Sequence, residues 1–452
     1  MVYFSFRIQF SYGKLRSYLR QMIRFLGITF WIVALAQVAF AQSGNNFTAG
    51  SPWELDSLHG VLHAVNRTDA PHPIRLGNEN IRAIYEACSR APIALIANHT
   101  SRIPETGGRQ STHLADSLLS LGMDIRKVFA PEHGFRGDAH NGAHIEDEFD
   151  VKTGLPLISL HGTFQKPTPE MLADVRMILF DIQDVGARFY TYLSTLFLAM
   201  EAAAENGKVL VVLDRPNPHG HQLAGPIVES KWTSFVGKIP VPILHGMTLG
   251  EMAQMINGEG WLSNGIACDL IVIPCEGYAH SDRWFPTISP SPNLPTDESI
   301  ALYPSLCLFE PTQASIGRGT PYPFECIGFP GMPTGSYAFT PQPVEGAAPF
   351  PKHDGILCSG QNLKSLGRSW IEGSSGFDLN WVARYADIWN EVHPQQPFVK
   401  TPSSFGRLSG SDAFVEAFDQ HSPSPIVLPD WTAELIDFHK KQAPYWLYPM
   451  QR

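Results

Sequence analysis

Short apolar runs that alternate with helical patterns fill the chain between residues 79 and 280. The runs cover residues 93–97, 125–129, 155–160, 177–180, 209–213 and 270–273, and the helical patterns cover 79–89, 112–121, 191–204 and 249–257. A strand that helices cover on both faces is apolar at every position, whereas a strand with one wet face alternates. The pattern therefore predicts an α/β domain built on a Rossmann-like parallel sheet.

The sequence changes character near Pro274. Residues 286–304 are rich in Pro and Ser, and beyond them apolar runs at 307–309 and 337–339 mix with helical patterns at 381–392 and 431–441. We expect a Rossmann-like domain over 79–280 and a smaller α+β C-terminal domain over 281–452, whose core contains Trp370, Trp381, Trp389, Trp431 and Trp446. The cleft that the second domain closes is the expected binding site.

The N-terminal segment has the features of a targeting signal. Arg20 and Arg24 precede an apolar run at 25–36, and Ala39-Phe40-Ala41 has the small-x-small form of a cleavage site. We predict a signal peptide over 1–41, an N-terminal extension over 42–78 and no stable membrane insertion after cleavage. An uncleaved anchor is the alternative, because residues 25–41 approach the minimum length for a membrane span. Met22 is a second possible start.

Charge and motif content exclude several classes of protein. The net charge is -10, and no Lys/Arg run beyond the N-terminus could neutralise phosphates, so nucleic acid is not an expected partner. The six cysteines have no C-x-x-C spacing and are expected to be small buried residues. Dinucleotide-binding, Walker, H-E-x-x-H and G-x-S-x-G motifs are absent from the sequence.

Polar residues follow five of the six apolar runs. They are Asn98-His99-Thr100, Glu132-His133, His161, Asp181 to Asp184, and Asp214-Arg215. Open α/β sheets bind ligands at the carboxyl ends of their strands, so these residues predict one site. The alternative is that strand ends become polar simply where they meet solvent.

Glu132 is the leading candidate for a catalytic acid or base. It lies in the segment Ala130-Pro-Glu-His-Gly-Phe-Arg-Gly137, where a Pro and two Gly allow sharp turns. A carboxylic acid in a partly dry cleft keeps its proton more readily, as a general acid requires. An ion pair between Glu132 and Arg136 is the alternative. We assign His133 and Arg136 to substrate binding, although a His beside Gly also commonly hydrogen-bonds a turn.

Further candidates lie in three segments. Residues 181–192 offer Asp181 and Asp184 as a second catalytic group, and Arg188 and Tyr190 as substrate contacts. Asp184 could instead stabilise the start of a helix, and Arg188 could pair with either carboxylate. The turn at 214–220 offers Asp214, Arg215 and Asn217 for sugar hydroxyls, or else a self-capped Asx turn. Asn98 completes the substrate-binding set, and Arg318, between two Gly, suits an acidic ligand or is a surface residue.

Eight segments together give the sequence a wider resemblance: PEHGFRG (131–137), TGLPLISLHG (153–162), KPTPEML (166–172), FDIQDVGARFYTY (180–192), LDRPNPHG (213–220), HGMTLGEMA (245–253), PSPNLPT (290–296) and the stretch from YPSLCLFE to GRGT (303–320). In this order they resemble the exo-β-N-acetylmuramidases of the NamZ type. Pro311, Ile316 and the Gly-free loop 98–101 depart from the pattern.

The resemblance implies a Rossmann-like domain with a smaller C-terminal domain and no metal or organic cofactor. It also implies release of N-acetylmuramic acid (MurNAc) from the non-reducing end of peptidoglycan fragments. Glu132 matches the proposed catalytic acid, and muropeptides or the disaccharide of MurNAc and N-acetylglucosamine (MurNAc-GlcNAc) would be the substrates. A bacterial periplasmic or secreted location follows.

Two alternative functions stay open at the level of sequence. Glu132, His133, Asp181 and His161 could hold a metal in a hydrolase that cleaves cell-wall amides or esters. A non-catalytic periplasmic protein that binds muropeptides is the other. For the glycosidase, an enzyme nucleophile, an activated water and attack by the substrate's own acetamido group are equally open.

Overall fold

The computed structural model describes residues 73–104, 111–132, 134–136, 148–162, 164–333, 335–373, 376–418 and 425–451. The predicted signal peptide, most of the predicted extension and His133 lie outside these residues. Within them, no helix combines the length and apolar character that crossing a membrane requires.

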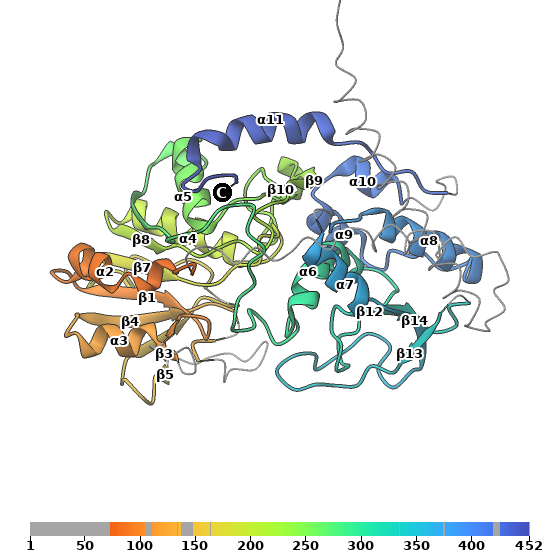
Figure 1. The fold of residues 1–452 in the computed structure, drawn as a ribbon, viewed down its shortest axis with the longest axis horizontal. Helices are drawn as coiled ribbons and strands as arrows, with labels where there is room; N and C mark the ends of the chain where they lie inside the picture. The colour runs from red at the N-terminus through yellow and green to blue at the C-terminus, as the bar shows by residue number, and fades with distance from the viewer. Residues whose placement is uncertain are drawn as a thin grey trace, which may run out of the picture. The chain divides into compact units, whose positions relative to one another are not determined.

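Seven described strands form the main sheet, in the order β11-β8-β7-β1-β4-β6-β5 (Figure 1). They are β11 (Asp269–Ile273), β8 (Val209–Leu213), β7 (Met177–Asp181), β1 (Ile93–Ala97), β4 (Ile125–Ala130), β6 (Pro156–Ser159) and β5 (Glu148–Phe149). The first six are parallel, which confirms the predicted sheet, and all six predicted runs are strands. The unpredicted β5 pairs antiparallel with β6.

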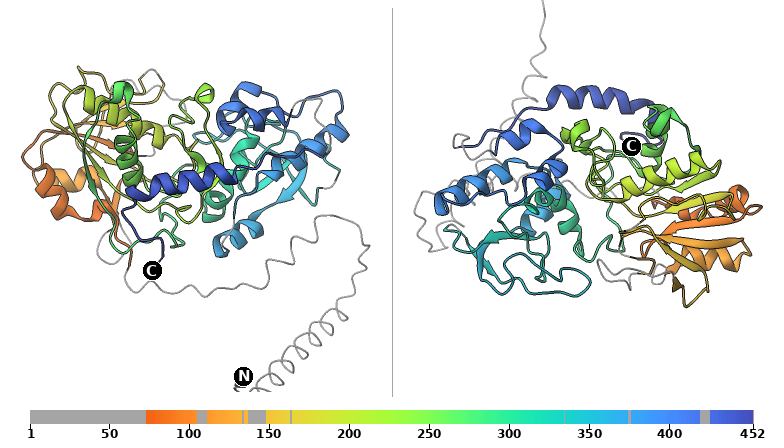
Figure 2. Two further views of the ribbon diagram at one scale, coloured as in Figure 1. Left: turned by 90° about the horizontal axis from the view of Figure 1, so that it is seen from above. Right: turned by 180° about the vertical axis from the view of Figure 1, so that it is seen from behind.

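Helices cover both faces of this sheet (Figures 1 and 2). Ile93, Leu95 and Ala97 of β1 pack in a cluster with α2 (Ile81–Cys88) and α3 (Leu114–Ser120). Ala94 and Ile96 point to the opposite cluster, with α4 (Tyr192–Glu205) and α5 (Leu249–Gly258). Alternate side chains of one strand are therefore buried on opposite faces, which is why the run is apolar throughout.

The C-terminal part confirms the smaller α+β domain. Its antiparallel sheet has the order β12 (Cys326–Phe329), β14 (Cys358–Asn362), β13 (Tyr337–Phe339). Its helices are α6 (Asp297–Leu306), α7 (Lys364–Glu372), α8 (Asn380–Val392), α9 (Pro402–Ser409), α10 (Asp412–Glu416) and α11 (Thr432–Gln442). The apolar run at 307–309 is not a strand but a 3-10 turn, η5 (Cys307–Phe309), that directly follows α6.

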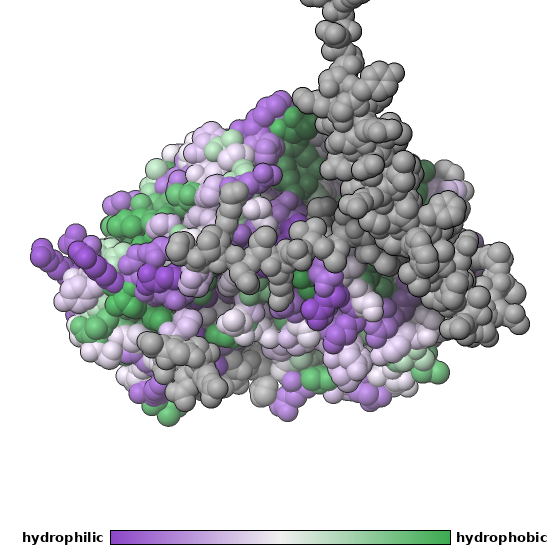
Figure 3. All heavy atoms as spheres, viewed as in Figure 1, coloured by the Kyte–Doolittle hydropathy of each residue, from purple (hydrophilic) through white to green (hydrophobic). Residues whose placement is uncertain are grey.

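Short elements complete the described chain. Two small antiparallel sheets pair β2 (Arg102–Pro104) with β3 (Ser111–His113), and β9 (Ala224–Ile227) with β10 (Pro242–Leu244). Single 3-10 turns occur at η2 (Gly77–Glu79), η3 (Ser230–Trp232), η4 (Ser263–Gly265) and η6 (Ala443–Tyr445). Polar and apolar residues are interspersed over the visible coloured surface in Figure 3.

One hydrophobic cluster joins the two parts. It contains Phe180 and Leu196 from the main sheet and α4, and Phe309 and Trp389 from the C-terminal part. Trp381 is also buried and stacks on Trp370 with ring centroids 5.1 Å apart. All six cysteines are free and buried, as expected of small core residues. The domain bounds at 280 and 281 stay a prediction.

The C-terminal tail, residues 443–451, returns to the main sheet (Figure 1). The Tyr448 hydroxyl donates to Asp214 Oδ2 at 2.6 Å, and the Leu447 N–H donates to Glu251 Oε1 at 2.9 Å. The Pro449 carbonyl accepts from the His280 N–H at 3.0 Å. The end of the described chain is thus bonded to the residue after β8, to α5 and to the segment that follows β11.

Candidate active site

Glu132 lies two residues after β4, beside the start of α4. Its carboxylate oxygen Oε2 accepts a hydrogen bond from the Thr191 hydroxyl at 3.1 Å, and its carbonyl accepts one from the Tyr192 hydroxyl at 3.2 Å. The residue is half-buried, and Gly134 has the positive φ of 71° that lets the loop turn back. Two residues at the entrance of α4 therefore hold the side chain and backbone of Glu132.

Arg136 does not pair with Glu132, which was the alternative to a catalytic role. Its guanidinium contacts Asp150 at 2.6 Å and Asp116 at 2.9 Å. These bonds hold the pKa of Asp150 down at about 2. This placement favours a structural role for Arg136 over the predicted contact with substrate.

Two buried tyrosines stand beside Glu132. Tyr192 accepts from Asn98 Nδ2 at 2.8 Å, and Tyr190 donates to the Pro290 carbonyl at 2.8 Å. Their rings meet edge to face with centroids 5.0 Å apart. Burial and the charges of Glu132 and Asp184 raise both pKa values, so the phenols stay protonated. The two phenols can therefore donate hydrogen bonds. The Glu132 and Asp184 carboxylates are close enough to affect the pKa of both.

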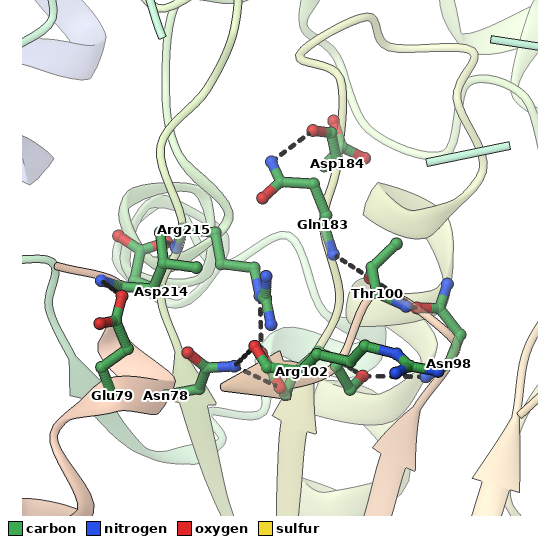
Figure 4. Close-up of polar contacts among 12 residues, drawn as sticks. Asn78, Glu79, Asn98, Thr100, Arg102, Gln183, Asp184, Asp214 and Arg215 are labelled. Carbon is green, nitrogen blue, oxygen red and sulfur yellow. Dashed lines mark hydrogen bonds and ion pairs between the residues drawn. The ribbon is translucent and has the colours of Figure 1, made fainter. Parts of the chain in front are cut away.

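The Asn98 amide links the ends of β1 and β7 (Figure 4). Its Oδ1 accepts from the Thr100 N–H and hydroxyl, at 2.9 and 2.6 Å, and the Thr100 hydroxyl oxygen accepts from the Gln183 N–H at 3.1 Å. Asn98 is fully buried. Its placement favours holding Tyr192 over direct contact with a sugar.

Asp184 keeps one carboxylate oxygen without a partner. Oδ1 accepts from the Gly186 N–H at 2.6 Å, whereas the buried Oδ2 has no hydrogen bond with any residue that the structure describes. Burial raises the pKa of Asp184 to about 7, against the lowering effect of the Val185 and Gly186 N–H groups. Asp184 can therefore exchange a proton near neutral pH, which suits acid–base chemistry.

Asp181, the other predicted catalytic carboxylate, is fully enclosed. Its Oδ1 pairs with Arg215 Nε at 2.6 Å, and its Oδ2 accepts from Asn78 Nδ2 at 3.1 Å. A carboxylate with both oxygens bonded inside the protein favours a structural role. Arg215, which is labelled in Figure 4, shares that role as the partner of Asp181.

Asp214 and Asn217 make internal bonds rather than an open pair of ligands. Asp214 is fully buried and accepts from the Gly250 N–H at 2.8 Å, the Thr248 hydroxyl at 2.7 Å and Tyr448. Burial raises the pKa of Asp214 to about 6. Asn217 Oδ1 accepts from the His219 N–H at 2.7 Å, so the structure has the Asx turn that was the alternative to sugar binding.

Arg188 and Arg318 are also engaged. Arg188 is buried and donates to four carbonyls, those of Pro226, Val241, Leu408 and Ser409, at 2.7–3.0 Å. It pairs with neither Asp181 nor Asp184, and this placement favours a structural role. Arg318 is half-buried and pairs with Glu310 at 2.9 Å, so an acidic ligand would have to compete with that carboxylate.

The contacts therefore connect Glu132 with Thr191 and Tyr192, and through Tyr192 with Tyr190 and Asn98. The charge of Asp184 acts on both tyrosines. His133 lies outside the described residues. No group of three or more His, Cys, Asp or Glu side chains within the described ranges could hold a metal ion.

Family models identify the sequence pattern along most of this fold. Residues 93–298 match the N-terminal domain of the exo-β-N-acetylmuramidase NamZ, and residues 301–448 match its C-terminal domain. The chain belongs to the NamZ family. A relative in this family, the peptidoglycan β-N-acetylmuramidase NamZ of Bacillus subtilis, is 38% identical over 408 residues, which are 85% of this chain and 93% of that protein.

Solved structures of similar chains carry the NamZ-family fold. One DUF1343 family protein of Bacteroides fragilis is 37% identical, has a TM-score of 0.73 and matches 84% of this chain and 99% of its own. A second from the same organism is 28% identical with a TM-score of 0.69, over 83% of this chain and 99% of its own.

Sequence reasoning gave Thr191 and Tyr192 no role of their own in the candidate site, although it placed His99 among the residues at the strand ends. Thr191 and Tyr192 belong to the segment 180–192, and their position at a helix entrance after a strand end is the signal that could have found them. His99 Nε2 lies 2.8 Å from the Ser289 carbonyl, a contact 190 residues away along the chain. Nothing in the local sequence indicates that partner.

Proposed function

We propose that this protein is an exo-acting β-N-acetylmuramidase. It hydrolyses the β-1,4 bond between a MurNAc residue at the non-reducing end and the next GlcNAc in peptidoglycan fragments. The observation that carries the proposal is the similarity over 408 residues to a peptidoglycan β-N-acetylmuramidase. Glu132, half-buried and held at the carboxyl end of β4, supports it.

Glu132 is the proposed general acid. A general acid needs a fixed position within hydrogen-bonding distance of the oxygen that it protonates. The Thr191 hydroxyl holds Oε2 and the Tyr192 hydroxyl holds the backbone, so one rotation of the side chain is favoured. Oε1, which no described residue binds, is the atom that we assign to donating the proton to the leaving oxygen.

Asp184 is the proposed second group, because the Asp181 carboxylate is already paired with Arg215. Its pKa of about 7 lets it accept a proton from water or from the substrate's acetamido N–H. Activation of water would invert the anomeric centre, whereas attack by a protein carboxylate or by the acetamido group would retain it. The anomer that NMR detects first separates these routes.

The proposed substrate and the N-terminal segment agree on location. A signal peptide over 1–41 would deliver the enzyme to the periplasm or the medium of a bacterium, where peptidoglycan fragments occur. No metal or organic cofactor is needed for this chemistry, since the acid and the second group are side chains.

The test is release of free MurNAc from the MurNAc-GlcNAc disaccharide, comparing wild type with Glu132→Gln. The amide keeps the shape of the side chain but cannot donate a carboxylic proton, so we expect a loss of at least about 100-fold in kcat. Glu170→Gln, an exposed glutamate near the start of β7, is the matched control and should keep full activity.

Three results would contradict the proposal. A Glu132→Gln variant with nearly full activity would rule out Glu132 as the general acid, and a wild type that releases no MurNAc would rule out the activity. Activity that disappears on dialysis against a chelator and returns with zinc would indicate a metal-assisted hydrolase instead.

A further inference from the structure

One arginine near the site has no acidic partner. Arg136, Arg215 and Arg318 are each paired with a carboxylate, and Arg188 donates to carbonyls. Arg283, in the segment between β11 and α6, makes no hydrogen bond or ion pair with any described residue and is exposed. Partial burial lowers its pKa, and no described carboxylate raises it. It is still a cation at neutral pH, and its charge is not compensated.

Arg283 follows His280 by three residues, and the His280 ring packs beside Gly220, where a Cβ would lie 3.5 Å from His280 Nδ1. This contact places the segment that contains Arg283 near His219 and His221, which flank Gly220 after β8, and the positive charge of Arg283 lowers the pKa of both rings. Farther along the same segment, the Ser289 and Pro290 carbonyls contact His99 and Tyr190. Residues 283–290 therefore connect the neighbourhood of the turn after β8 with Tyr190, which lies next to Tyr192 beside Glu132.

The residues after β8 include neutral polar side chains that have atoms without a hydrogen-bond partner among the described residues. His221 Nδ1 and Gln222 Oε1 are buried without a hydrogen-bond partner in the described chain. Burial lowers the pKa of His221 to about 2, so its ring is neutral. Buried polar atoms without partners are rare in folded proteins and often mark a place for water or a ligand.

The aromatic residue Trp370 lies close to Gln222. Gly376 lies between Gln222 and Trp370, because a Cβ on Gly376 would meet Trp370 Cβ at 3.1 Å and Gln222 Nε2 at 3.2 Å. Trp370 is half-buried. A cation, neutral donors and acceptors, and an aromatic surface together suit an acidic carbohydrate.

We propose that Arg283, with His221 and Gln222, forms a subsite that binds a carboxylate of the glycan. This inference rests on the proposed function and names the part of the substrate that the enzyme recognises. The Arg283 guanidinium can bind a carboxylate through two N–H groups.

The carboxylate could belong to the lactyl group of MurNAc or to a peptide attached to it. Three substrates separate these sources: the MurNAc-GlcNAc disaccharide, the same disaccharide with its lactyl group as a primary amide, and a form that carries a stem peptide. Steady-state kinetics on each compare wild type, Arg283→Gln, Arg283→Lys and Arg126→Gln. Arg126 is an exposed arginine at the opposite edge of the sheet and serves as the matched control.

For recognition of the lactyl group we expect Arg283→Gln to raise KM for the acid about tenfold or more, with kcat nearly unchanged. The amide should show no such difference between the variants, and Arg283→Lys should recover part of the affinity. A KM effect confined to the peptide-bearing substrate would place the subsite on the stem peptide and would also support the proposal.

Equal effects on the acid and the amide, or no effect on any substrate, would overturn it. Calorimetric titration with free MurNAc measures binding at the subsite independently of catalysis. If the wild type cleaves nothing but binds MurNAc at least about tenfold more tightly than Arg283→Gln, the proposed function fails and the subsite stands. Equal binding by both proteins, of free MurNAc and of MurNAc that carries the stem peptide, would reject the subsite as well.

Discussion

Asp184 makes the fold sensitive to pH through a single side chain. Its carboxyl group has a pKa of about 7 in the folded protein, against about 3.9 in an unfolded chain. Between these values the folded state holds one more proton than the unfolded state, so stability falls as pH rises. Above pH 7 the full cost of the buried charge is present.

Replacing Asp184 by Asn should remove this dependence. We expect the wild type to lose at least about 1 kcal/mol more free energy of unfolding between pH 5 and pH 8 than Asp184→Asn does. Urea denaturation at several pH values measures it, and Asp354→Asn, at an exposed position, should keep the wild-type slope. Parallel curves for wild type and Asp184→Asn would show that Asp184 ionises normally.

Single residues also show where prediction from sequence stops. Glu132 was identified because it follows a predicted strand inside a Pro- and Gly-rich loop, and its position at the sheet edge agrees. Asp181 and Asp214 meet the same criteria, yet Asn78 and Tyr448 enclose them from distant parts of the chain. A strand-end carboxylate is recognisable from sequence, but the partners that enclose it depend on tertiary contacts.

At the scale of elements, the apolar runs sufficed to predict the sheet. Strands β1, β7 and β8 are buried on both faces and leave a continuous apolar pattern, whereas the two-residue strand β5 leaves none. The run at 307–309 looked like a strand but follows α6 as a 3-10 turn, because short apolar runs do not distinguish the two.

Arg188 ties several elements together. Its guanidinium bonds the Pro226 and Val241 carbonyls, from β9 and the residue before β10, to the Leu408 and Ser409 carbonyls at the end of α9. Arg188→Met removes these donors and leaves four buried acceptors unpaired, which should cost about 3 kcal/mol or more. Urea denaturation measures the loss, and Arg188→Lys should recover part of it. A change below about 1 kcal/mol would show that water replaces the guanidinium.

At the scale of the whole molecule, the C-terminal tail completes a buried network. Tyr448 donates to Asp214, and burial has already raised the pKa of that carboxyl to about 6. Tyr448→Phe removes a donor that lowers this pKa, so the folded-state pKa should rise further. The ionised form then costs more, and the loss of stability should be greater at pH 8 than at pH 5, by about 1 kcal/mol.

Denaturation of Tyr448→Phe at the two pH values checks this. Tyr445→Phe is the control, because Tyr445 donates to the less buried Glu259 at 3.0 Å. Its effect should be small and should not depend on pH between 5 and 8. Equal losses of stability for both variants at both pH values would show that Tyr448 does not affect the ionisation of Asp214.

The hydrogen bond between Tyr448 and Asp214 also determines when the network around Asp214 can form during folding. Tyr448 and Asp214 are 234 positions apart, so the carboxylate at the end of β8 lacks this donor until almost all of the described chain is present. Contacts of such long range form late and slow the search for the native state. If the chain is exported unfolded with its N-terminus leading, as the predicted signal implies, we expect the network around Asp214 to form only after Tyr448 has crossed the membrane. The tail would then be the last part of the described chain that the buried network around Asp214 needs in order to form.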